Sequence, residues 1–313
     1  MKERSTQGST QAEGYDYTAK DDGTFVAVSQ RTGEISSVVN ITAPSGSYVI
    51  TPDAQQARKE VEERERKEYF AAIGRDNRSE KFYFIPSSES FDGLSPADVT
   101  RMIYLCTYMN YDGRLMKSER IPMMRGDLED VLGLSHSQTW RFLCAVTDKG
   151  YLAEDGNGGL FPDRKRFRKK AMKRGGIWYQ KIYVKGVRSL YKSSDVGQHG
   201  QAGSLFALLP YVNIEHNVLC YNIEEKDLDR VSFMNLRQFC EAIHYDVKGL
   251  KRKLRELREI TFDVGGHKER FYSVTGDGVD LEASHLFVNP NILYSGTNPD
   301  AVRSLGAFCD PSR

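Results

Sequence analysis

A dense run of basic residues is the segment whose side chains point most directly to a chemistry. Eight of the eleven residues in 164–174 are Lys or Arg, and no Asp or Glu follows until Asp195. Basic side chains that neutralise phosphates release counterions, which gives tight binding that weakens as the salt concentration rises. The run therefore predicts a phosphate-binding surface made by Arg164, Lys165, Arg166, Arg168, Lys169, Lys170, Lys173 and Arg174.

Aromatic residues lie within and after this run. Phe167, Trp178 and Tyr179 are interleaved with the basic side chains. Rings in such positions stack on bases or contact sugars in proteins that bind nucleic acids. They could equally pack beneath a hairpin, and the sequence leaves both roles open.

The net charge of +1 hides a segregation of charge along the chain. The 313 residues include 44 Lys+Arg and 43 Asp+Glu, but residues 81–193 alone hold 20 basic and 12 acidic side chains. Residues 1–80 and 194–313 carry more acidic than basic side chains. Positive charge concentrated in one third of a chain indicates the kind of binding partner and not the fold. The usual partner of such a segment is a polyanion.

Two short helices are predicted before the basic run. The first covers residues 125–132 and ends at Gly133. Ser135, followed three residues later by Gln138, is the pattern of a helix N-terminus, and Gly150 fits the left-handed position that ends a helix. Two such helices joined by a tight turn make a helix-turn-helix. The side chains of the second helix that we expect in the core are Trp140, Leu143, Cys144 and Val146.

The opposite face of this second helix has side chains suited to reading base edges. Gln can pair with adenine and Arg with guanine through two hydrogen bonds each. After the helix, apolar pairs at 151–152 and 160–161 flank a Gly-rich turn and predict a hairpin, or wing. The predicted DNA contacts of the helix are Ser135, His136, Ser137, Gln138, Thr139 and Arg141, with Ser137, Gln138 and Arg141 facing the bases.

The same pattern recurs 111 residues later along the chain. Asn235 with Gln238 is expected to cap the first helix of this second pair, and Asp246 to cap the second helix. Residues 260–262 and 270–274, on either side of Gly265-Gly266, predict a second hairpin. A repeat of cap, spacing and wing is stronger support than either copy alone. The predicted DNA contacts of the second copy are Lys248, Lys251, Arg252 and Arg255.

The apolar positions of the two copies can be aligned one by one. The first copy has Leu128, Val131, Leu132, Leu134, Leu143, Val146 and Tyr151, with Ser135 as the cap. The second copy has Phe239, Ala242, Ile243, Tyr245, Leu254, Leu257 and Phe262, with Asp246 as the cap. Every position expected to face inward is therefore apolar in both copies.

Residues 128–152 resemble the helix-turn-helix of MarR-type winged-helix proteins. The segment Leu134-Ser135-His136-Ser137-Gln138-Thr139 occupies the place of the Leu-Ser-x-Ser-Thr motif of that family. Two such copies, preceded by a hairpin and by Gly33-Glu34-Ile35, also resemble replication initiators of plasmids and phages of low-GC Gram-positive bacteria. The resemblance implies that the second helix of each pair enters the major groove while the wing and nearby basic residues hold the backbone. The basic run after the first wing is longer than a MarR-type wing needs.

We therefore expect an α+β chain with tandem winged-helix domains and an N-terminal β-hairpin and helix extension. A charged helix over 52–73 is either a solvated spacer or a dimerising helix. Ser95 as cap and Pro96 at the first helical position predict a helix that runs to Asn110. The expected divisions are a disordered tail (1–20), the hairpin and charged helix (21–80), winged-helix domain 1 with its basic wing or linker (81–193), winged-helix domain 2 (194–296) and a C-terminal tail (297–313).

Catalytic and metal-binding patterns are missing from the sequence. There is no G-x-x-x-x-G-K-[ST] phosphate loop and no H-x-H pair, and the six histidines are dispersed. The five cysteines form no C-x-x-C, which argues against a zinc knuckle or a disulfide framework. No apolar run approaches the roughly 20 residues that span a bilayer, and no signal peptide is visible. We expect a cytoplasmic binding protein that is not an enzyme and has no cofactor or metal.

The sequence leaves three functions open. Origin binding in plasmid or phage replication is favoured, because two unequal winged helices in one chain can read a directly repeated site as a monomer. A transcription regulator of a phage or mobile element would more naturally be a symmetric dimer on a palindrome. The third is an adaptor that docks proteins or RNA. The expected partner is double-stranded DNA, with host replication proteins or a second copy of the chain as further candidates, and no membrane.

Overall fold

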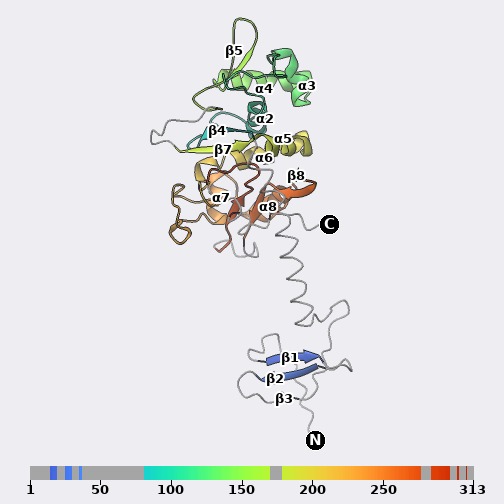
Figure 1. The fold of residues 1–313 in the computed structure, drawn as a ribbon, viewed down its shortest axis with the longest axis vertical. Coiled ribbons are helices and arrows are strands. Elements are labelled where there is room, and N and C mark those ends of the chain that lie inside the picture. Colours follow the sequence, from blue (N-terminus) through green and yellow to red (C-terminus); the bar gives the residue numbers. More distant parts are fainter. Residues whose placement is uncertain are drawn as a thin grey trace. The chain divides into compact units, whose positions relative to one another are not determined.

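The computed structural model describes residues 81–169, 178–275 and 283–296, Val302, Phe308, and three strands near the N-terminus (Figure 1). The chain divides into two compact units, Met1–Ala71 and Ala72–Arg313. Both helices and small antiparallel sheets occur, so the chain is a mixed α+β protein. The predicted helix at 52–73 lies outside the described residues.

The N-terminal unit contains a three-stranded antiparallel sheet. Strands β1 (Tyr15–Ala19), β2 (Phe25–Ser29) and β3 (Ile35–Ser36) pair in the order β1-β2-β3. The predicted hairpin is confirmed by the pairing of β2 with β3. The prediction of a disordered tail over 1–20 is wrong for residues 15–19, whose Tyr and Thr residues favour a strand and which pair with β2.

The first described elements of the second unit are strand β4 (Phe82–Pro86) and helix α2 (Pro96–Cys106). The Ser95 hydroxyl accepts a hydrogen bond from the Asp98 amide at 3.2 Å, and Pro96 occupies the first turn, as the sequence predicts. The helix ends at Cys106 instead of Asn110. The backbone turns there, because Met109 pairs with Leu115 in an antiparallel bridge.

Two helices and a hairpin follow α2. A short turn η1 (Arg125–Asp127) leads into α3 (Leu128–Leu132), and α4 (His136–Asp148) begins after Gly133, whose φ of 60° is left-handed. Strands β5 (Leu152–Glu154) and β6 (Leu160–Pro162) form the predicted first hairpin. The Leu115 amide donates to Leu160 O at 2.9 Å, so the segment after α2 extends the hairpin into a small sheet.

The remaining elements repeat this order with additions. They are β7 (Tyr179–Tyr183), α5 (Val184–Ser193), η2 (Val196–Gln198), α6 (His199–Phe206), η3 (Leu209–Tyr211), η4 (Leu228–Arg230), α7 (Leu236–Ala242), η5 (Val247–Gly249), α8 (Leu250–Arg258), β8 (Thr261–Val264), β9 (His267–Arg270), β10 (Tyr272–Val274) and β11 (Leu286–Val288). The second hairpin is β8 with β9 around Gly265 and Gly266, both with positive φ. The prediction that residues 270–274 form its return strand is wrong beyond Arg270, because β10 pairs with β11.

Backbone hydrogen bonds show the same repeat independently of side-chain type. The Leu134 amide donates to Glu129 O at 3.3 Å, and 111 residues later the Tyr245 amide donates to Cys240 O at 2.8 Å. The turn residues between the paired helices, Gly133 and His244, have φ of 60° and 53°. Four aligned pairs of apolar residues are buried in both copies: Leu128 and Phe239, Leu143 and Leu254, Val146 and Leu257, Tyr151 and Phe262.

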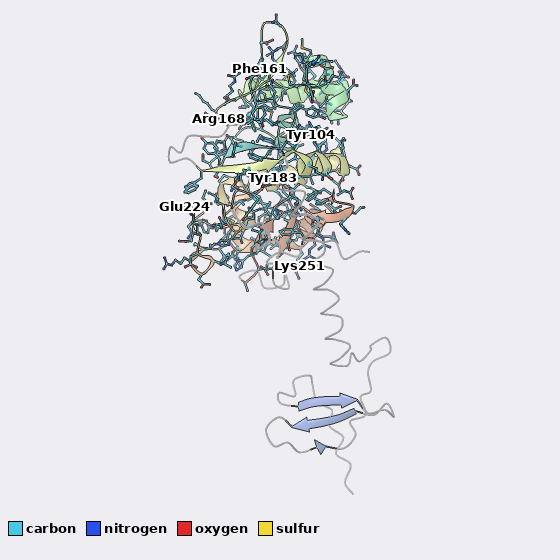
Figure 2. All side chains as sticks on the ribbon, viewed as in Figure 1. Tyr104, Phe161, Arg168, Tyr183, Glu224 and Lys251 are labelled. Carbon is cyan, nitrogen blue, oxygen red and sulfur yellow. The ribbon has the colours of Figure 1, made fainter. Side chains whose placement is uncertain are left out.

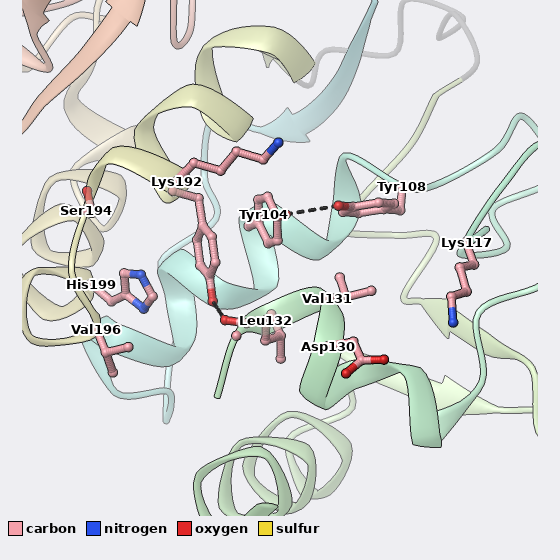
Figure 3. Close-up of a pocket in the computed structure, with 12 residues that line it drawn as sticks. Tyr104, Tyr108, Lys117, Asp130, Val131, Leu132, Lys192, Ser194, Val196 and His199 are labelled. Atoms are coloured by element: carbon pink, nitrogen blue, oxygen red, sulfur yellow. Dashed lines mark hydrogen bonds between the residues drawn. The ribbon is translucent and has the colours of Figure 1, made fainter. Parts of the chain in front are cut away.

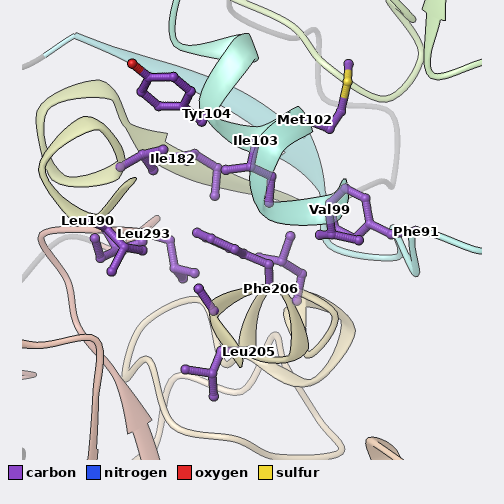
Figure 4. Packing of buried hydrophobic residues seen from close by; sticks show 14 of the residues in the cluster. Phe91, Val99, Met102, Ile103, Tyr104, Ile182, Leu190, Leu205, Phe206 and Leu293 are labelled. Atoms are coloured by element: carbon purple, nitrogen blue, oxygen red, sulfur yellow. The ribbon is translucent and has the colours of Figure 1, made fainter. Parts of the chain in front are cut away.

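The two copies share one hydrophobic core. The larger of two clusters of buried residues runs from Tyr83 to Leu293 and includes side chains of α2, α4, α6 and α8. Helices α2 and α6 pack closely against each other at its centre. Figure 4 shows Phe206 of α6 lying toward Val99 and Ile103 of α2. Residues of both expected divisions, 81–193 and 194–296, therefore contribute to one packed unit.

The close approach of α2 and α6 depends on Gly203. A Cβ at this position would overlap the carbonyl oxygen of Pro96, so only glycine allows the observed separation. The Thr100 hydroxyl also donates to His199 O at 2.7 Å across the same contact. Backbone groups of both repeats thus meet directly at the helix crossing.

Membrane-spanning helices and clustered metal ligands do not occur in the described residues. None of the helices described combines the length and apolar composition that crossing a membrane requires. Within the same residues, no three His, Cys, Asp or Glu side chains gather as a metal site. Cys106, Cys144, Cys220 and Cys240 are free thiols.

Replacing Gly203 with Ala should destabilise the second unit by about 2 kcal/mol or more, because backbone must move to accept the methyl group. Gly200, on the same helix, has no atom within 4 Å of the position that a methyl group would take. Gly200→Ala is therefore the matched control and should be neutral or slightly stabilising. Thermal unfolding of the two variants measures the difference. Equal melting temperatures would contradict a tight helix crossing at Gly203.

Candidate nucleic-acid interface

The N-terminus of α4 is held by the predicted reciprocal cap. The Ser135 hydroxyl accepts from the Gln138 amide at 3.4 Å, and the Ser135 amide donates to Gln138 Oε1 at 3.2 Å. This arrangement satisfies backbone donors at the start of the helix. It also occupies the Gln138 side-chain oxygen, which recognition of adenine through two hydrogen bonds would need. Gln138 is half-buried, whereas Ser137 and Arg141 are exposed.

The buried face of α4 is rotated by about one residue from the face that the sequence predicts. Thr139, Phe142, Leu143 and Val146 are buried, at the spacing of one helix face. Thr139 is only 5% exposed and cannot reach DNA, so its prediction as a contact is wrong. Trp140, predicted to face the core, is 52% exposed because it lies outside this stripe. The Arg125 guanidinium lies 5.3 Å from its ring centroid.

The exposed face of α4 is close to neutral. His136 at its start is exposed and pairs with Glu129 of α3. Arg141 is exposed, and its guanidinium donates to Ser137 O at 3.3 Å. Asp148 is exposed at the other end of the helix. This face therefore presents one permanent cation together with polar groups and an acid.

Helix α8, the counterpart of α4, has a strongly basic exposed face. Leu250, Leu254 and Leu257 are buried and fix its orientation. Asp246 caps the short turn η5 that leads into α8, since its carboxylate accepts from the Lys248 amide at 2.9 Å, whereas the N-cap of α8 itself is Gly249. Figure 2 labels Lys251 at the surface of this helix. The predicted contacts Lys248, Lys251, Arg252 and Arg255 are all exposed, as is Arg258.

Most of these α8 cations have no acidic partner in the part of the chain that the structure describes. Arg252 is the one with an acid nearby, at 3.6 Å from Glu256, and it also donates to the Tyr245 hydroxyl at 3.1 Å. Lys248, Lys251 and Arg255 form no ion pair among the described residues. Their charge is available to an external anion, in contrast to a surface where acids and bases alternate.

The described part of the basic run is largely tied to the protein itself. Arg166 forms an ion pair with buried Glu89 at 2.6 Å, and its guanidinium lies 4.2 Å from the Tyr151 ring centroid. Arg164 donates to the Asp112 carbonyl, and the Lys169 ammonium donates to Met109 O at 2.8 Å. Lys165 is exposed. Lys170, Lys173 and Arg174 lie outside the described residues.

These contacts give the run a role that the sequence did not reveal. Arg166 joins the segment after the hairpin to the segment before α2, across 77 positions of the chain. Burial lowers the pKa of Lys169, and the neighbouring charges of Lys81 and Arg188 lower it further. A cation held among other cations is a sign of local positive potential. The described part of the run is therefore a structural clamp, in which Lys169 lies near two other cations.

The aromatic residues near the run have different environments. Phe167 is 1% exposed, and its ring centroid lies 6.4 Å from that of Phe91 in the core. Packing beneath the hairpin is therefore its role, and base stacking by Phe167 is excluded. Trp178 is exposed and Tyr179 is half-buried, so both remain accessible.

A groove of about 570 Å³ lies between α2, α3 and the segment that joins α5 to α6 (Figure 3). Tyr104 and Tyr191 stack with ring centroids 3.8 Å apart, and the Tyr191 hydroxyl donates to Leu132 O at 2.9 Å. His199 stacks on Tyr191 at 4.3 Å and is 2% exposed. No residue of α4 or α8 lines the groove, which separates it from the basic face.

Burial of His199 gives the groove a titratable group. Among the residues that the structure describes, neither ring nitrogen of His199 has a hydrogen-bond partner. Burial, and then the charge of Arg101, lower the pKa of His199 to about 4, while the nearby backbone of Ser194 and Tyr191 acts in the opposite direction. The ring is therefore neutral near pH 7.

In comparisons with known proteins, no family model, no curated protein and no solved structure matches the chain. The candidate interface therefore rests on the geometry of this chain alone. Its strongest feature is the basic face of α8, followed by the polar face of α4. The arrangement suits electrostatic binding and hydrogen bonding to a polyanion.

Replacing Arg166 with Ala should lower the free energy of unfolding by about 2–3 kcal/mol, because the buried Glu89 carboxylate loses its cation. Lys165→Ala is the matched control, since Lys165 is exposed and should change stability by less than about 0.5 kcal/mol. Urea unfolding of the two variants compares them. A larger loss for Lys165→Ala than for Arg166→Ala would refute the clamp.

Acid should destabilise the protein through His199. Its pKa is about 4 in the folded chain against an ordinary value of 6.5, so the unfolded chain takes up the proton first as the pH falls. Stability contributed by the neutral ring is present above pH 6.5 and is lost between pH 6.5 and about 4, by up to roughly 1.4 kcal/mol per pH unit. His199→Phe retains a ring beside Tyr191 and cannot take a proton. As the pH falls through this range, the free energy of unfolding should therefore decrease more steeply for the unchanged protein than for His199→Phe. If the two plots of unfolding free energy against pH were parallel, His199 would not be the group responsible.

Proposed function

We propose that residues 81–296 form two winged-helix modules that bind double-stranded DNA without catalysis. Each module would consist of a packing helix, a helix-turn-helix and a hairpin: α2, α3, α4 and β5–β6 in the first, and α6, α7, α8 and β8–β9 in the second. The repeated backbone hydrogen bonds and the left-handed turns at Gly133 and His244 support the equivalence of the two modules. In such modules the second helix of the pair enters the major groove.

The basic face of α8 is the observation that carries this proposal. Three leucines bury one side of the helix, and five Lys or Arg side chains with Glu256 make up the rest of its surface. A helix fits the major groove, where the phosphates of both strands lie along its flanks. Lys248 and Lys251 are suited to phosphates, whereas Arg252 and Arg255 have the fork geometry that pairs with phosphate or with guanine. Release of counterions would supply most of the affinity.

The α4 face would contribute selectivity more than affinity. Ser137 and Arg141 are its exposed polar side chains opposite the buried stripe. Gln138 can read a base only through its amide nitrogen unless the helix cap opens. Arg141 is therefore the residue of α4 that we expect to discriminate between base pairs, with Ser137 and His136 as flanking contacts.

The unequal charge of α4 and α8 supports origin binding in plasmid or phage replication. A symmetric dimer presents two identical helices to a palindrome. Here a single chain presents two different helices, which suits an asymmetric site that is repeated in one direction. Such a protein would act in the cytoplasm, where plasmid or phage DNA lies. Footprinting on selected DNA tests this: direct repeats support an initiator, and an inverted repeat at a promoter would instead indicate a transcription regulator.

The double variant Arg252→Ala/Arg255→Ala should weaken binding to any duplex by at least about tenfold. The slope of log binding constant against log salt concentration should become less steep by roughly 1 for each phosphate that the protein no longer contacts. Lys226→Ala/Arg230→Ala is the matched control, because it removes the same charge from an exposed segment on another element. Fluorescence anisotropy of a labelled duplex across a salt series measures both quantities. Equal losses from the two pairs would refute a specific role for α8.

A further inference from the structure

The sheet formed by β4 and β7 has one buried face and one accessible face. Tyr83, Ile85, Gln180 and Ile182 are buried on the face that packs on the core. Residues between them point to the opposite side, since side chains alternate along a strand. This outer face holds Phe82, Phe84, Pro86, Tyr179, Lys181 and Tyr183, all half-buried.

Strand register arranges the outer face in rows. Phe84 is paired with Lys181 on one side and with Arg168 on the other, which gives a row of cation, ring and cation. In the next row Phe82 is paired with Tyr183. Figure 2 labels Arg168 and Tyr183 beside these strands. Directly opposed residues of an antiparallel pair have their side chains on the same face of the sheet.

The rings on this face contact one another and not the core. Phe82 lies edge to face with Phe84, at 5.3 Å between centroids, and with Tyr183 at 6.2 Å. The Lys181 ammonium lies 5.6 Å from the Phe82 centroid. None of these rings is among the side chains that pack against the hydrophobic cluster. Packing therefore does not account for a row of aromatic side chains at this position.

The surroundings of the rings are positive. Lys181, which lies on this face, forms no ion pair with any described residue. Lys81 and Lys169 are at neighbouring positions of the opposite parity, and they lie close enough for the two charges to affect each other. The Lys169 ammonium is also 6.0 Å from the ring of Tyr111, which is 67% exposed. No acidic residue occurs between Arg164 and Asp195. The surface thus combines accessible rings with the cations Lys181 and Arg168.

We propose that the outer face of the β4–β7 sheet binds a single-stranded polynucleotide. Unpaired bases would stack on Phe84 and Phe82, and the backbone phosphates would lie on Lys181 and Arg168. Stacking needs bases whose flat faces are free, which a duplex does not offer, and rings with nearby cations are the usual platform for it. A site on β4 and β7 is separate from α8, so it goes beyond the duplex-binding function and does not depend on it.

The test uses the full chain and two fluorescein-labelled probes of 20 nucleotides, oligo(dT) and oligo(U), which separate DNA from RNA as the source of the strand. Phe84→Ala should weaken binding of the preferred probe roughly tenfold, in line with the loss of one stacked base. Phe84→Tyr keeps a ring and should bind normally. Tyr221→Ala, which removes a 55% exposed ring elsewhere, is the matched control and should bind like the unchanged protein.

Lys181→Glu is a second variant that leaves the rings in place. It should weaken single-strand binding and leave the melting temperature close to that of the unchanged protein, since the backbone hydrogen bond from residue 181 to Ser295 is retained. Arg252→Ala/Arg255→Ala should lose duplex binding and retain oligo(dT) or oligo(U) binding, which separates failure of this site from failure of α8. The proposal is overturned if neither probe binds at low salt, or if Phe84→Ala and Lys181→Glu both bind like Tyr221→Ala.

Discussion

The contact between α2 and α6 is the constraint on which the rest of the second unit depends. Gly203 lets the backbone of α6 approach the Pro96 carbonyl, and the Thr100 hydroxyl joins the two helices at His199 O. Joining the repeats gives one continuous core and fixes α4 and α8 relative to each other. A fixed pair of helices is what a single chain needs to recognise an asymmetric site.

Charges of the same sign have two different uses in this protein. Arg166 is directed inward to Glu89, where it holds the segment after the first hairpin in place. Lys251 and Arg255 are directed outward on α8 and have no acidic partner among the described residues. Counting basic residues along the sequence treats both uses alike. Only the environment of each guanidinium or ammonium group distinguishes a structural cation from one that is free to bind phosphate.

Local signals in the sequence predicted the local structure well. The caps at Ser95, Ser135 and Asp246 are contacts between residues two or three positions apart, so their sequence patterns are sufficient. The repeat at 111 residues is visible because buried positions stay apolar in both copies. The phase of α4 does not follow from its sequence in the same way, since Thr139 is small enough to be buried and Trp140 is amphipathic. A shift of the buried face by one residue exchanges the two environments, so that Thr139 is buried and Trp140 is exposed.

Long-range features could not be predicted in the same way. The partner of Arg166 is 77 residues away, and the partners of β4 lie in β7, so neither follows from local spacing. The aromatic rows on the outer sheet face exist only because Phe82 and Phe84 are brought opposite Tyr183 and Lys181. The sequence indicated stacking only for the rings nearest the basic run. The fold instead buries Phe167 and brings other rings to the positive surface.

Placement of α8 in the major groove of DNA underlies the proposed function. Methylation interference is the sharpest test of it, because methyl groups on guanine N7 lie in that groove. The DNA fragments for the test are selected from a genomic pool by the purified chain of 313 residues. If α4 and α8 both lie in the groove, the selected fragments share a site, with interfering guanines in two separate major-groove segments. Fragments without a shared site, or binding that is indifferent to N7 methylation, would show that the helices do not bind there.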